Sequence, residues 1–600
     1  MHGARPSEYG IEIDMESKRS SNRIAYIYFS CVESLFVFFC KTEYELAKWG
    51  NIIWDEAYVG KTLLVSLVAG ILLGSVSCRL ILGIRQREKV LNRDKREKGT
   101  SGWLCKLSER RLFWGSLVLI VLSWLPTYLA YYPAICAYDF PVQLEQITKG
   151  EYIDHHPIAH TLLIRVFLRL GEGVFGKVNS GIALFAALQI FLLASVLAYG
   201  IVLLRRFRVG KGWIIGMQLV SMFYPFHWYL SISMTKDVLF TVFFLLQILA
   251  LFRMLLEDRQ DLRIRGGEWV LAGATVGMIL FRNNGKYAML VLLVIQLLMI
   301  WRGKRARKLW ERIFLVSLSA FLMGNLLLSG LFAATHATQG DRREMLCVPT
   351  QQLARCMLYH GGKGILSEDD GTMDAEDVDM IDQFILSEGY RYYQADFADP
   401  VKRYVNTSAA LRQAERFVKT YVHLFMQYPG DFINAVLALD AGYLYPEDET
   451  HAFVNQVDYA PGKGYVQTRW AESELEPIGF YKDSKWEWLH EHLEQWAEEN
   501  AYLKVPVLKY LFVPGVFLWA YLLLAGVLLI DHKTRMLMPL SLVLGYDITL
   551  LLGPVVQLRY LYPIMVVLPF AALLACRWQG EMRTEEKNVE DMDQKIKEGK

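Results

Sequence analysis

Long apolar segments recur along the 600-residue chain, and they limit its possible folds more than any other feature. A helix needs about 20 apolar residues to cross a bilayer, and segments of that kind alternate here with short charged loops. We predict about 12 transmembrane helices, the first of them weak because it is short and contains Glu33. The predicted spans are residues 24–40, 61–83, 112–130, 180–204, 213–230, 236–256, 267–281, 287–301, 312–334, 506–530, 535–556 and 560–577. The pattern indicates an all-α polytopic membrane protein, with Pro225 marking a kink or an end in the fifth span.

Lysine and arginine are unevenly distributed among the loops between these spans. Short loops rich in these residues usually remain in the cytoplasm. With the spans above, all the strongly basic segments fall on one side: residues 84–111, 205–211, 253–265, 302–312, 531–535 and the tail from 577. Both termini are therefore predicted to be cytoplasmic. This segregation accounts for the basic residues without a nucleic-acid partner.

The segment 157–170 is apolar, but His160, Arg165 and Arg169 interrupt it. If this segment crossed the membrane, every later basic loop would face outward. We therefore predict an amphipathic helix that lies on the outer face of the membrane.

The long polar stretch after the ninth predicted span is too long for a connection without structure of its own. We predict that it forms a mostly helical extracytoplasmic domain. The expected organisation is 1–110, N-terminal spans and basic loop; 111–334, membrane core with the first outer loop at 131–179; 335–505, extracytoplasmic domain; 506–577, C-terminal spans; and 578–600, cytoplasmic tail. Two of the eight cysteines, Cys347 and Cys356, fall in the outer domain and can form a disulfide there.

The first outer loop carries a carboxylate directly after a predicted span, with histidines downstream. Asp139 follows Tyr138 and precedes Gln143, and the further polar residues are Asp154, His155, His156 and His160. A carboxylate at the membrane surface can act as a general base toward a hydroxyl or help to hold a divalent cation such as Mg²⁺ or Mn²⁺. In the alternative interpretation, Asp139 caps the following helix and the histidines are interfacial. Both interpretations remain open at this point.

Basic residues are scarce in the short turns of the predicted outer side, and the four in those turns are candidates for binding a phosphate. They are Lys236, Arg282, Lys286 and Arg559, with the neighbouring polar residues Asp237, Asn283 and Asn284. Arginine binds phosphate oxygens in a bidentate manner, although interfacial snorkelling explains each residue taken singly. In the outer domain, Glu344, Gln351 and Arg355 fall near helical spacing, with Gln352 beside them, and they either face this site or attach the domain to the membrane part.

These motifs resemble the GT-C superfamily of membrane glycosyltransferases. The closest resemblance is to an uncharacterised bacterial family of that clan, found mainly in Gram-positive genomes. It covers about residues 110–575 and rests on Tyr138-Asp139, His155-His156-Pro157 with His160, Lys236-Asp237, Arg282-Asn-Asn-Gly285, Pro349-x-Gln351-Gln352-x-Ala-Arg355 and Asp399-Pro-Val-Lys402.

The resemblance implies a GT-C-like fold in the bacterial plasma membrane. It implies transfer of a sugar from a polyprenyl-phosphate carrier to an extracytoplasmic acceptor, a cell-wall polymer or another glycan. Asp139 would be the catalytic or metal-associated carboxylate, and Lys236, Arg282 and Arg559 would contact the carrier phosphate. The chain departs from the better-known GT-C pattern because Phe140 and Pro141 follow Asp139 in place of a second acidic residue. Either Asp139 acts alone, or Asp154 and the histidines complete the site.

Two other classes of function fit part of the pattern. A flippase or transporter of a lipid-linked precursor would have internal repeats and ionisable residues near the bilayer midplane. Only Glu33 and Asp547 interrupt the predicted spans in that way. A glycan ligase or polymerase would use the same carrier on the same side of the membrane.

Overall fold

The computed structural model describes residues 8–96, 107–257, 266–302, 306–340, 342–362, 372–447, 472–499, 501, 504–506 and 508–576. Within these residues every regular element is a helix, and the only β-type pairing is five isolated bridges. The prediction of a helical polytopic membrane protein is confirmed at that level.

Nine described helices are long and apolar enough to cross a membrane. They are α1 (Glu8–Trp49), α2 (Glu56–Arg96), α4 (Glu109–Ala130), α7 (Val178–Arg206), α10 (Lys236–Glu257), α12 (Asn284–Arg302), α13 (Arg307–Thr335), α23 (Leu537–Leu551, with the preceding turn from Thr534) and α24 (Leu558–Ala575). Two shorter apolar helices, α11 (Gly266–Phe281) and α22 (Phe517–Ile530), lie among them.

The predicted span at 213–230 is not one helix. It is divided at Tyr224 into α8 (Lys211–Phe223) and α9 (Pro225–Ile232). Pro225 has no backbone N–H to continue the first helix, and its fixed φ suits the first position of the next. The proline therefore ends one helix and begins another.

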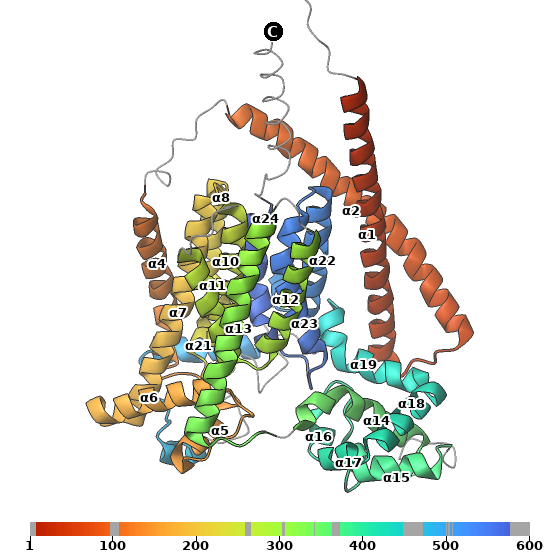
Figure 1. Ribbon diagram of the computed structural model, residues 1–600. Helices are drawn as coiled ribbons and strands as arrows, with labels where there is room; N and C mark the ends of the chain where they lie inside the picture. The colour runs from red at the N-terminus through yellow and green to blue at the C-terminus, as the bar shows by residue number, and fades with distance from the viewer. Residues whose placement is uncertain are drawn as a thin grey trace, which may run out of the picture.

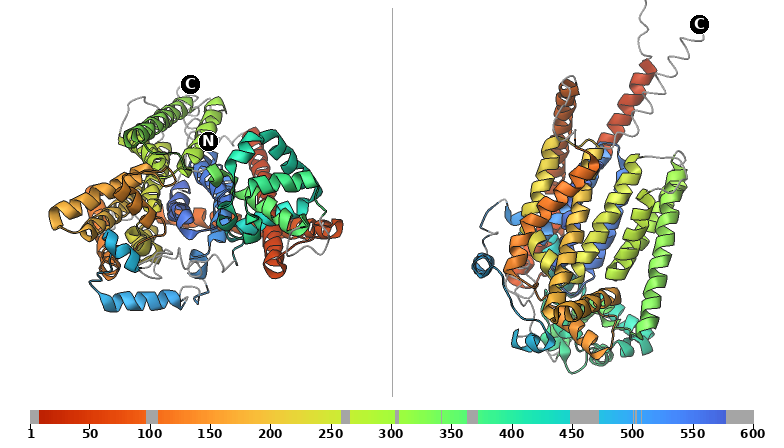
Figure 2. Two further views of the ribbon diagram at one scale, coloured as in Figure 1. Left: turned by 90° about the horizontal axis from the view of Figure 1, so that it is seen from below. Right: turned by 90° about the vertical axis from the view of Figure 1, so that its left-hand side faces the viewer.

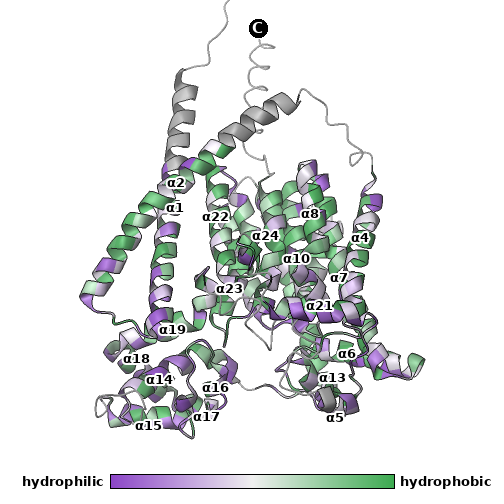
Figure 3. Ribbon diagram, turned by 180° about the vertical axis from the view of Figure 1, so that it is seen from behind, coloured by the Kyte–Doolittle hydropathy of each residue, from purple (hydrophilic) through white to green (hydrophobic). Residues whose placement is uncertain are grey.

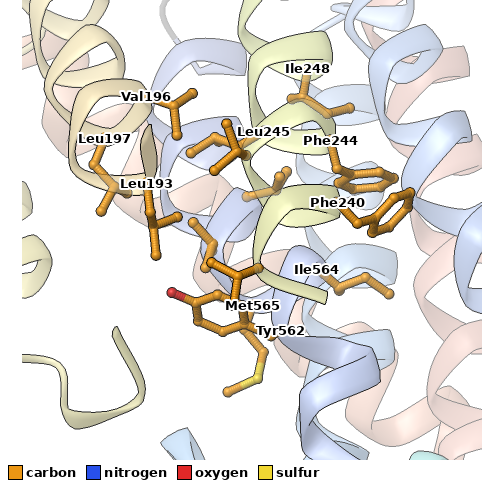
Figure 4. Packing of buried hydrophobic residues seen from close by; sticks show 14 of the residues in the cluster. Leu193, Val196, Leu197, Phe240, Phe244, Leu245, Ile248, Tyr562, Ile564 and Met565 are labelled. Atoms are coloured by element: carbon orange, nitrogen blue, oxygen red, sulfur yellow. The ribbon is translucent and has the colours of Figure 1, made fainter. Parts of the chain in front are cut away.

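Three helices form the centre of the bundle. Figure 4 shows side chains of α7, α10 and α24 packed together, among them Leu193, Phe240, Phe244 and Met565. Of the 18 residues in the most apolar segment of α10, 83% are buried, whereas 17% are buried in the corresponding segments of α1 and α2. The outer helices therefore expose apolar side chains, which include Leu63, Leu67, Val68, Ile71 and Leu72 of α2 (Figure 3). A continuous apolar surface of this kind is what a lipid-facing helix presents.

The helices that lie outside the bundle gather at one end of it (Figure 1). On one side lie α5 (Phe140–Lys149) and α6 (Ile158–Phe175), and α6 runs across the bundle end, where the sequence predicted an amphipathic helix. On the other side lie the helices of the outer region: α14 (Cys347–His360), α15 (Ala375–Phe384), α16 (Asp399–Lys402), α17 (Thr407–Arg412), α18 (Ala414–Gln427) and α19 (Pro429–Leu444). Seen from below in Figure 2, the C-terminal helices (blue) lie between these two groups.

Short elements complete the described chain. They are α20 (Glu472–Leu475), α21 (Glu487–Glu498) and the 3₁₀ turns Arg342–Leu346, Gly389–Tyr392, Glu476–Ile478, Leu508–Leu511, Pro514–Val516 and Thr534–Met536.

The disulfide considered for the outer region does not form. Cys347 and Cys356 are both buried free thiols. Both belong to α14, and nine residues of helix separate them by about 13 Å along the axis. A disulfide requires Cα atoms less than about 7 Å apart, so this helix rules out the bond.

Candidate functional site

Asp139 lies where the chain leaves α4 and enters α5. The intervening segment is held in place by backbone hydrogen bonds, from Ile135 N to Ile232 O and from Met234 N to Ile135 O. Asp139 occupies the cap position of α5, but its carboxylate makes no capping hydrogen bond. The side chain instead faces the starts of α10 and α24. The capping interpretation is therefore wrong for this carboxylate.

Two cations contact the Asp139 carboxylate. Its Oδ2 atom is 3.0 Å from Lys236 Nζ, the first residue of α10, and 3.2 Å from Arg559 Nη1, at the start of α24. His156 Nδ1 lies 4.0 Å from the same oxygen and 3.4 Å from Lys236 Nζ. The Asp139 side chain is only 12% exposed, so these contacts take place largely out of water.

These contacts determine the protonation states of the loop residues. Burial by itself would raise the pKa of Asp139, but the charges of Lys236 and Arg559 outweigh it and hold that pKa well below its usual value. Burial, together with the charge of Lys236, lowers the pKa of His156 well below its usual value. At neutral pH the carboxylate is therefore ionised and the imidazole is neutral.

A second carboxylate, Asp237, orders the arginines behind Asp139. It is completely buried and forms an ion pair with Arg282, and its Oδ2 atom lies 3.5 Å from Arg559 Nη1. Thr235 donates its hydroxyl to the same oxygen at 2.8 Å. The Arg282 guanidinium also lies over the Tyr560 ring, 4.6 Å from its centroid. Asp237 thus fixes both arginines near the start of α10.

The contacting groups do not balance in charge. Lys236, Arg282 and Arg559 supply three positive charges, whereas Asp139 and Asp237 supply two negative charges. His156 adds none, because it is neutral. Counted over these five residues, the cations exceed the carboxylates by one, an arrangement that suits an anionic ligand.

A second series of charged contacts connects the outer region to the histidines beside Asp139. His155 Nδ1 lies 4.0 Å from Glu344 Oε1, and the other oxygen of Glu344 accepts a hydrogen bond from Lys402 Nζ at 2.7 Å. Lys402 also pairs with Asp399 at 2.5 Å. Backbone pairing supports the contact, from Asp154 N to Thr338 O and from Ala398 N to Pro554 O.

Glu344 was predicted either to face the site or to attach the outer domain, and it contacts His155 beside the site. Asp399 and Lys402 were not among the predicted site residues. Asp399 and Lys402 are one helical turn apart in Asp399-Pro-Val-Lys402, and this spacing was the available signal for an ion pair. Nothing in the sequence indicated that the pair would meet Glu344, because 58 residues separate Lys402 from Glu344.

The remaining predicted residues of the histidine segment and of the α11–α12 turn contact one another and the helical bundle. Burial raises the pKa of Asp154, although Lys286 and a hydrogen bond from Asn283 act against that change. Asn284 donates to Thr549 Oγ1 at 3.1 Å. These contacts join the histidine segment and the α11–α12 turn to the core.

His160 and Gln143 lie in the interior. His160 is fully buried and its Nδ1 atom lies 3.0 Å from Gln143 Nε2, which also donates to Thr161. Burial lowers the pKa of His160 to about 3. Their described contacts join α5 to α6. Tyr138 is half-buried and directly precedes Asp139.

Gln351, Gln352 and Arg355 make their side-chain hydrogen bonds away from Asp139. Gln351 donates to the Gln394 carbonyl and Gln352 to the Phe432 carbonyl. Arg355 pairs with Asp431 at 3.0 Å and donates to Asn51 Oδ1 at 2.7 Å. Of the two alternatives left open by the sequence, their contacts match attachment of the outer region, because Asn51 belongs to the α1–α2 loop.

The family of unknown function DUF6020 matches residues 148–589, about three quarters of the chain. The chain belongs to this family. The matched range contains His155, His156, Lys236, Arg282 and Arg559, and it begins nine residues after Asp139. No curated protein and no solved structure matches the sequence.

A divalent cation was considered at the Asp139 site. Among the described residues, the side chains that bring three possible ligand atoms together are Asp374, Asp377 and His423 of the outer region. Asp139, Asp154 and the histidines do not form such a group there, and the nearest neighbours of Asp139 are cations. The donor set around Asp139 therefore fits an anion better than a metal ion.

Proposed function

We propose that this DUF6020 protein is a GT-C-type glycosyltransferase of the bacterial plasma membrane. It would transfer a sugar from a polyprenyl-phosphate carrier to an extracytoplasmic glycan or cell-wall polymer. The observation that carries the proposal is the contact of Asp139 with both Lys236 and Arg559 at the polar end of an apolar helical bundle. A base beside a cationic anion site is the combination that this transfer needs.

The proposed orientation has the Asp139 site outside the cell. The basic segments lie at the C-terminal ends of α7 and α12 and at the start of α13, at the end of the bundle opposite the outer region (Figure 1). α1 begins and α24 finishes at that same end. Because basic loops favour the cytoplasm, both termini would be cytoplasmic.

The carrier phosphate would bind to the surplus positive charge. Its oxygens would contact Lys236 and Arg559, and its polyprenyl chain would remain in the bilayer. During transfer the anomeric carbon–oxygen bond to the phosphate breaks, and the bonding electrons leave with the phosphate oxygen. Preorganised cations stabilise the charge that develops there.

Asp139 would accept the proton of the acceptor hydroxyl. In the unliganded site its pKa is depressed by Lys236 and Arg559, which makes it a weak base. A phosphate that shares these cations reduces their effect and raises the proton affinity of Asp139. The acceptor oxygen then attacks the anomeric carbon as its proton moves to Asp139. Base activation thus depends on the bound carrier. The outer region would bind the acceptor.

The proposal is tested with the full-length protein in lipid nanodiscs. A panel of short-chain polyprenyl-phosphate sugars with a labelled sugar is supplied together with cell-wall glycan fragments, and release of polyprenyl phosphate and labelling of the glycan are measured. Asp139→Asn is expected to lower the rate by about 10²–10⁴-fold, the usual contribution of a general base.

Glu145→Gln is the matched control, because Glu145 is an exposed carboxylate on α5 that pairs only with Lys149 among its described contacts. This variant is expected to keep the full rate. If the labelled lipid crosses the bilayer in proteoliposomes without cleavage of the sugar–phosphate bond, the protein is a transporter and the proposal fails. If the product is a carrier-linked polymer, the ligase or polymerase alternative is correct.

A further inference from the structure

The helix α18 exposes a stripe of apolar side chains. Val418, Val422, Phe425 and Met426 are 57%, 52%, 44% and 72% exposed, and their spacing places them on one face of the helix. Glu415 and Lys419 border the stripe. An apolar face of this size on an amphipathic helix requires a covering partner.

The opposite face of α18 is already occupied. Leu424 and Thr420 are buried against the outer region. Arg416 pairs with Asp379 of α15 at 2.7 Å, and His423 Nδ1 lies 2.6 Å from Asp377 of the same helix. The helix therefore cannot rotate to hide its apolar stripe without loss of these contacts.

The contacts of α19 fix the level of this stripe relative to the membrane. A Cβ placed on Gly430, at the start of α19, would lie 3.1 Å from the Trp54 ring. The Trp54 indole N–H donates to Asn434 Oδ1 of α19 at 2.8 Å. Trp54 belongs to the loop that joins α1 and α2; the exposed Ile53 lies in the same loop, and the exposed Trp49 is the last residue of α1. Tryptophan is typical of the membrane–water interface, so the junction of α18 and α19 lies at that interface.

A small apolar pocket continues the stripe inward. It has a volume of about 230 Å³ and is lined by Gln352, Phe425, Phe432, Ile433, Val436 and Leu437. Phe425 belongs both to the pocket and to the stripe. Ile433, which is 37% exposed, extends the apolar surface onto α19.

We infer that α18 lies in the outer leaflet of the bilayer, with the stripe against lipid acyl chains and the pocket filled by one of them. Three observations support lipid as the occupant. The stripe is continuous with an interfacial tryptophan loop, it is adjacent to the lipid-facing helices α1 and α2 (Figure 1), and charged residues border it as in interfacial helices. The outer region is then attached to the membrane at a point of its own, apart from the Asp139 site.

The test uses full-length protein in lipid nanodiscs with p-benzoylphenylalanine incorporated at Phe425. After illumination, covalent adducts are identified by mass spectrometry. The matched control is incorporation at Leu386, which is also 44% exposed and follows α15 (Figure 1). Incorporation at Val422 repeats the measurement, and each variant is first shown to be monodisperse by size-exclusion chromatography.

Phospholipid adducts at Phe425 and Val422, several times more frequent than at Leu386, are the expected result. Adducts to a second copy of the chain would show that the stripe is a protein interface and would overturn the inference. Equal lipid labelling at all three positions, or none at Phe425 and Val422, would also overturn it. None of these outcomes depends on the proposed transferase activity.

Discussion

Two arginine–carboxylate networks lie at the same end of this molecule, and they differ in how completely they are paired. In the outer region, Arg355 is satisfied by Asp431 and Asn51, and the second oxygen of Asp431 is bound by His360 at 2.8 Å. In the Asp139 cluster, three cations share two carboxylates. The first network pairs one arginine with one carboxylate, whereas the five residues of the second include one more cation than carboxylates. A buried arginine therefore indicates a binding site only when its countercharges are incomplete.

The two networks also connect different elements. Arg355 joins α14 to α19 and to the α1–α2 loop, so its contacts hold the outer region on the first helical hairpin. The Asp139 cluster draws its residues from four segments that the chain brings together from far apart: the first outer loop, α10, the α11–α12 turn and α24. The contacts of Arg355 are typical of a structural attachment between two parts of the chain, whereas those of the Asp139 cluster are typical of a functional site.

The largest expected effect concerns Asp237. Asp237→Asn leaves Arg282 and Arg559 buried without their shared countercharge, which should lower the free energy of unfolding by about 3–5 kcal/mol. Thermal unfolding in detergent measures this loss. The control Asp379→Asn removes an exposed partner of Arg416 and should leave the unfolding midpoint unchanged. Equal midpoints for the Asp237→Asn variant and the wild type would contradict the role assigned to Asp237.

The next largest effect is on the binding of a carrier phosphate, which only the Asp139 cluster is expected to contact. Arg559→Gln removes a charged contact to the carrier phosphate and should weaken binding of farnesyl phosphate by about 10–100-fold, because a charge-assisted hydrogen bond contributes about 1.5–3 kcal/mol. Arg355→Gln should leave this affinity unchanged. Isothermal titration in nanodiscs measures both. A similar loss in both variants would show that the networks do not differ as described.

The Arg355→Gln variant also tests whether Arg355 holds the outer region on the first helical hairpin. Arg355→Gln leaves the Asp431 charge with His360 as its remaining partner and should destabilise the protein by about 1–3 kcal/mol. Hydrogen exchange is expected to increase in α14 and α19 and to remain unchanged in α10. Faster exchange in α10 alone would contradict this assignment.

The smallest effect is a dependence on pH. Burial would raise the pKa of Asp431, but the hydrogen bond from His360 and the charge of Arg355 outweigh it and lower that pKa. The folded protein therefore releases this proton more readily than the unfolded chain does. The stability from this pair is present above the unfolded pKa of 3.8 and is lost as the pH falls through the lower folded value.

Asp431→Asn should cost about 1 kcal/mol at neutral pH and should reduce the part of acid destabilisation that occurs below about pH 4. Chemical unfolding of the wild type and of this variant at a series of pH values measures the difference. Parallel pH curves for the two proteins would show that Asp431 does not titrate in this way.

The sequence predicted the membrane class because that prediction depends on local properties. Apolar length is a property of each segment alone, and it located most of the helices. Two predicted spans differ from the structure: 213–230 is divided at Pro225, and 506–530 forms an α-helix only over Phe517–Ile530, after two 3₁₀ turns. The amphipathic helix at 157–170 was also predictable, since the pattern of basic loops excluded a span there.

The candidate site was predictable in its chemistry but not in its connections. The scarcity of charge on the outer side identified Asp139, Lys236 and Arg559 as candidates. Their meeting depends on contacts across 97 and 420 residues, which no local pattern encodes. The same limit applies to Gln351 and Arg355. Their helical spacing was predicted correctly, but the sequence did not determine which residues they contact.

The sequence by itself therefore determined that the chain has many apolar segments long enough to cross a membrane, and that its strongly basic loops are segregated from the segments that carry Asp139, Lys236 and Arg559. Only the tertiary structure decided that Asp139 is paired with two cations and not used as a helix cap, and that one cation remains in excess. The physical reason is that hydrophobic length acts within each helix, whereas charge balance depends on which distant residues come within about 4 Å of one another.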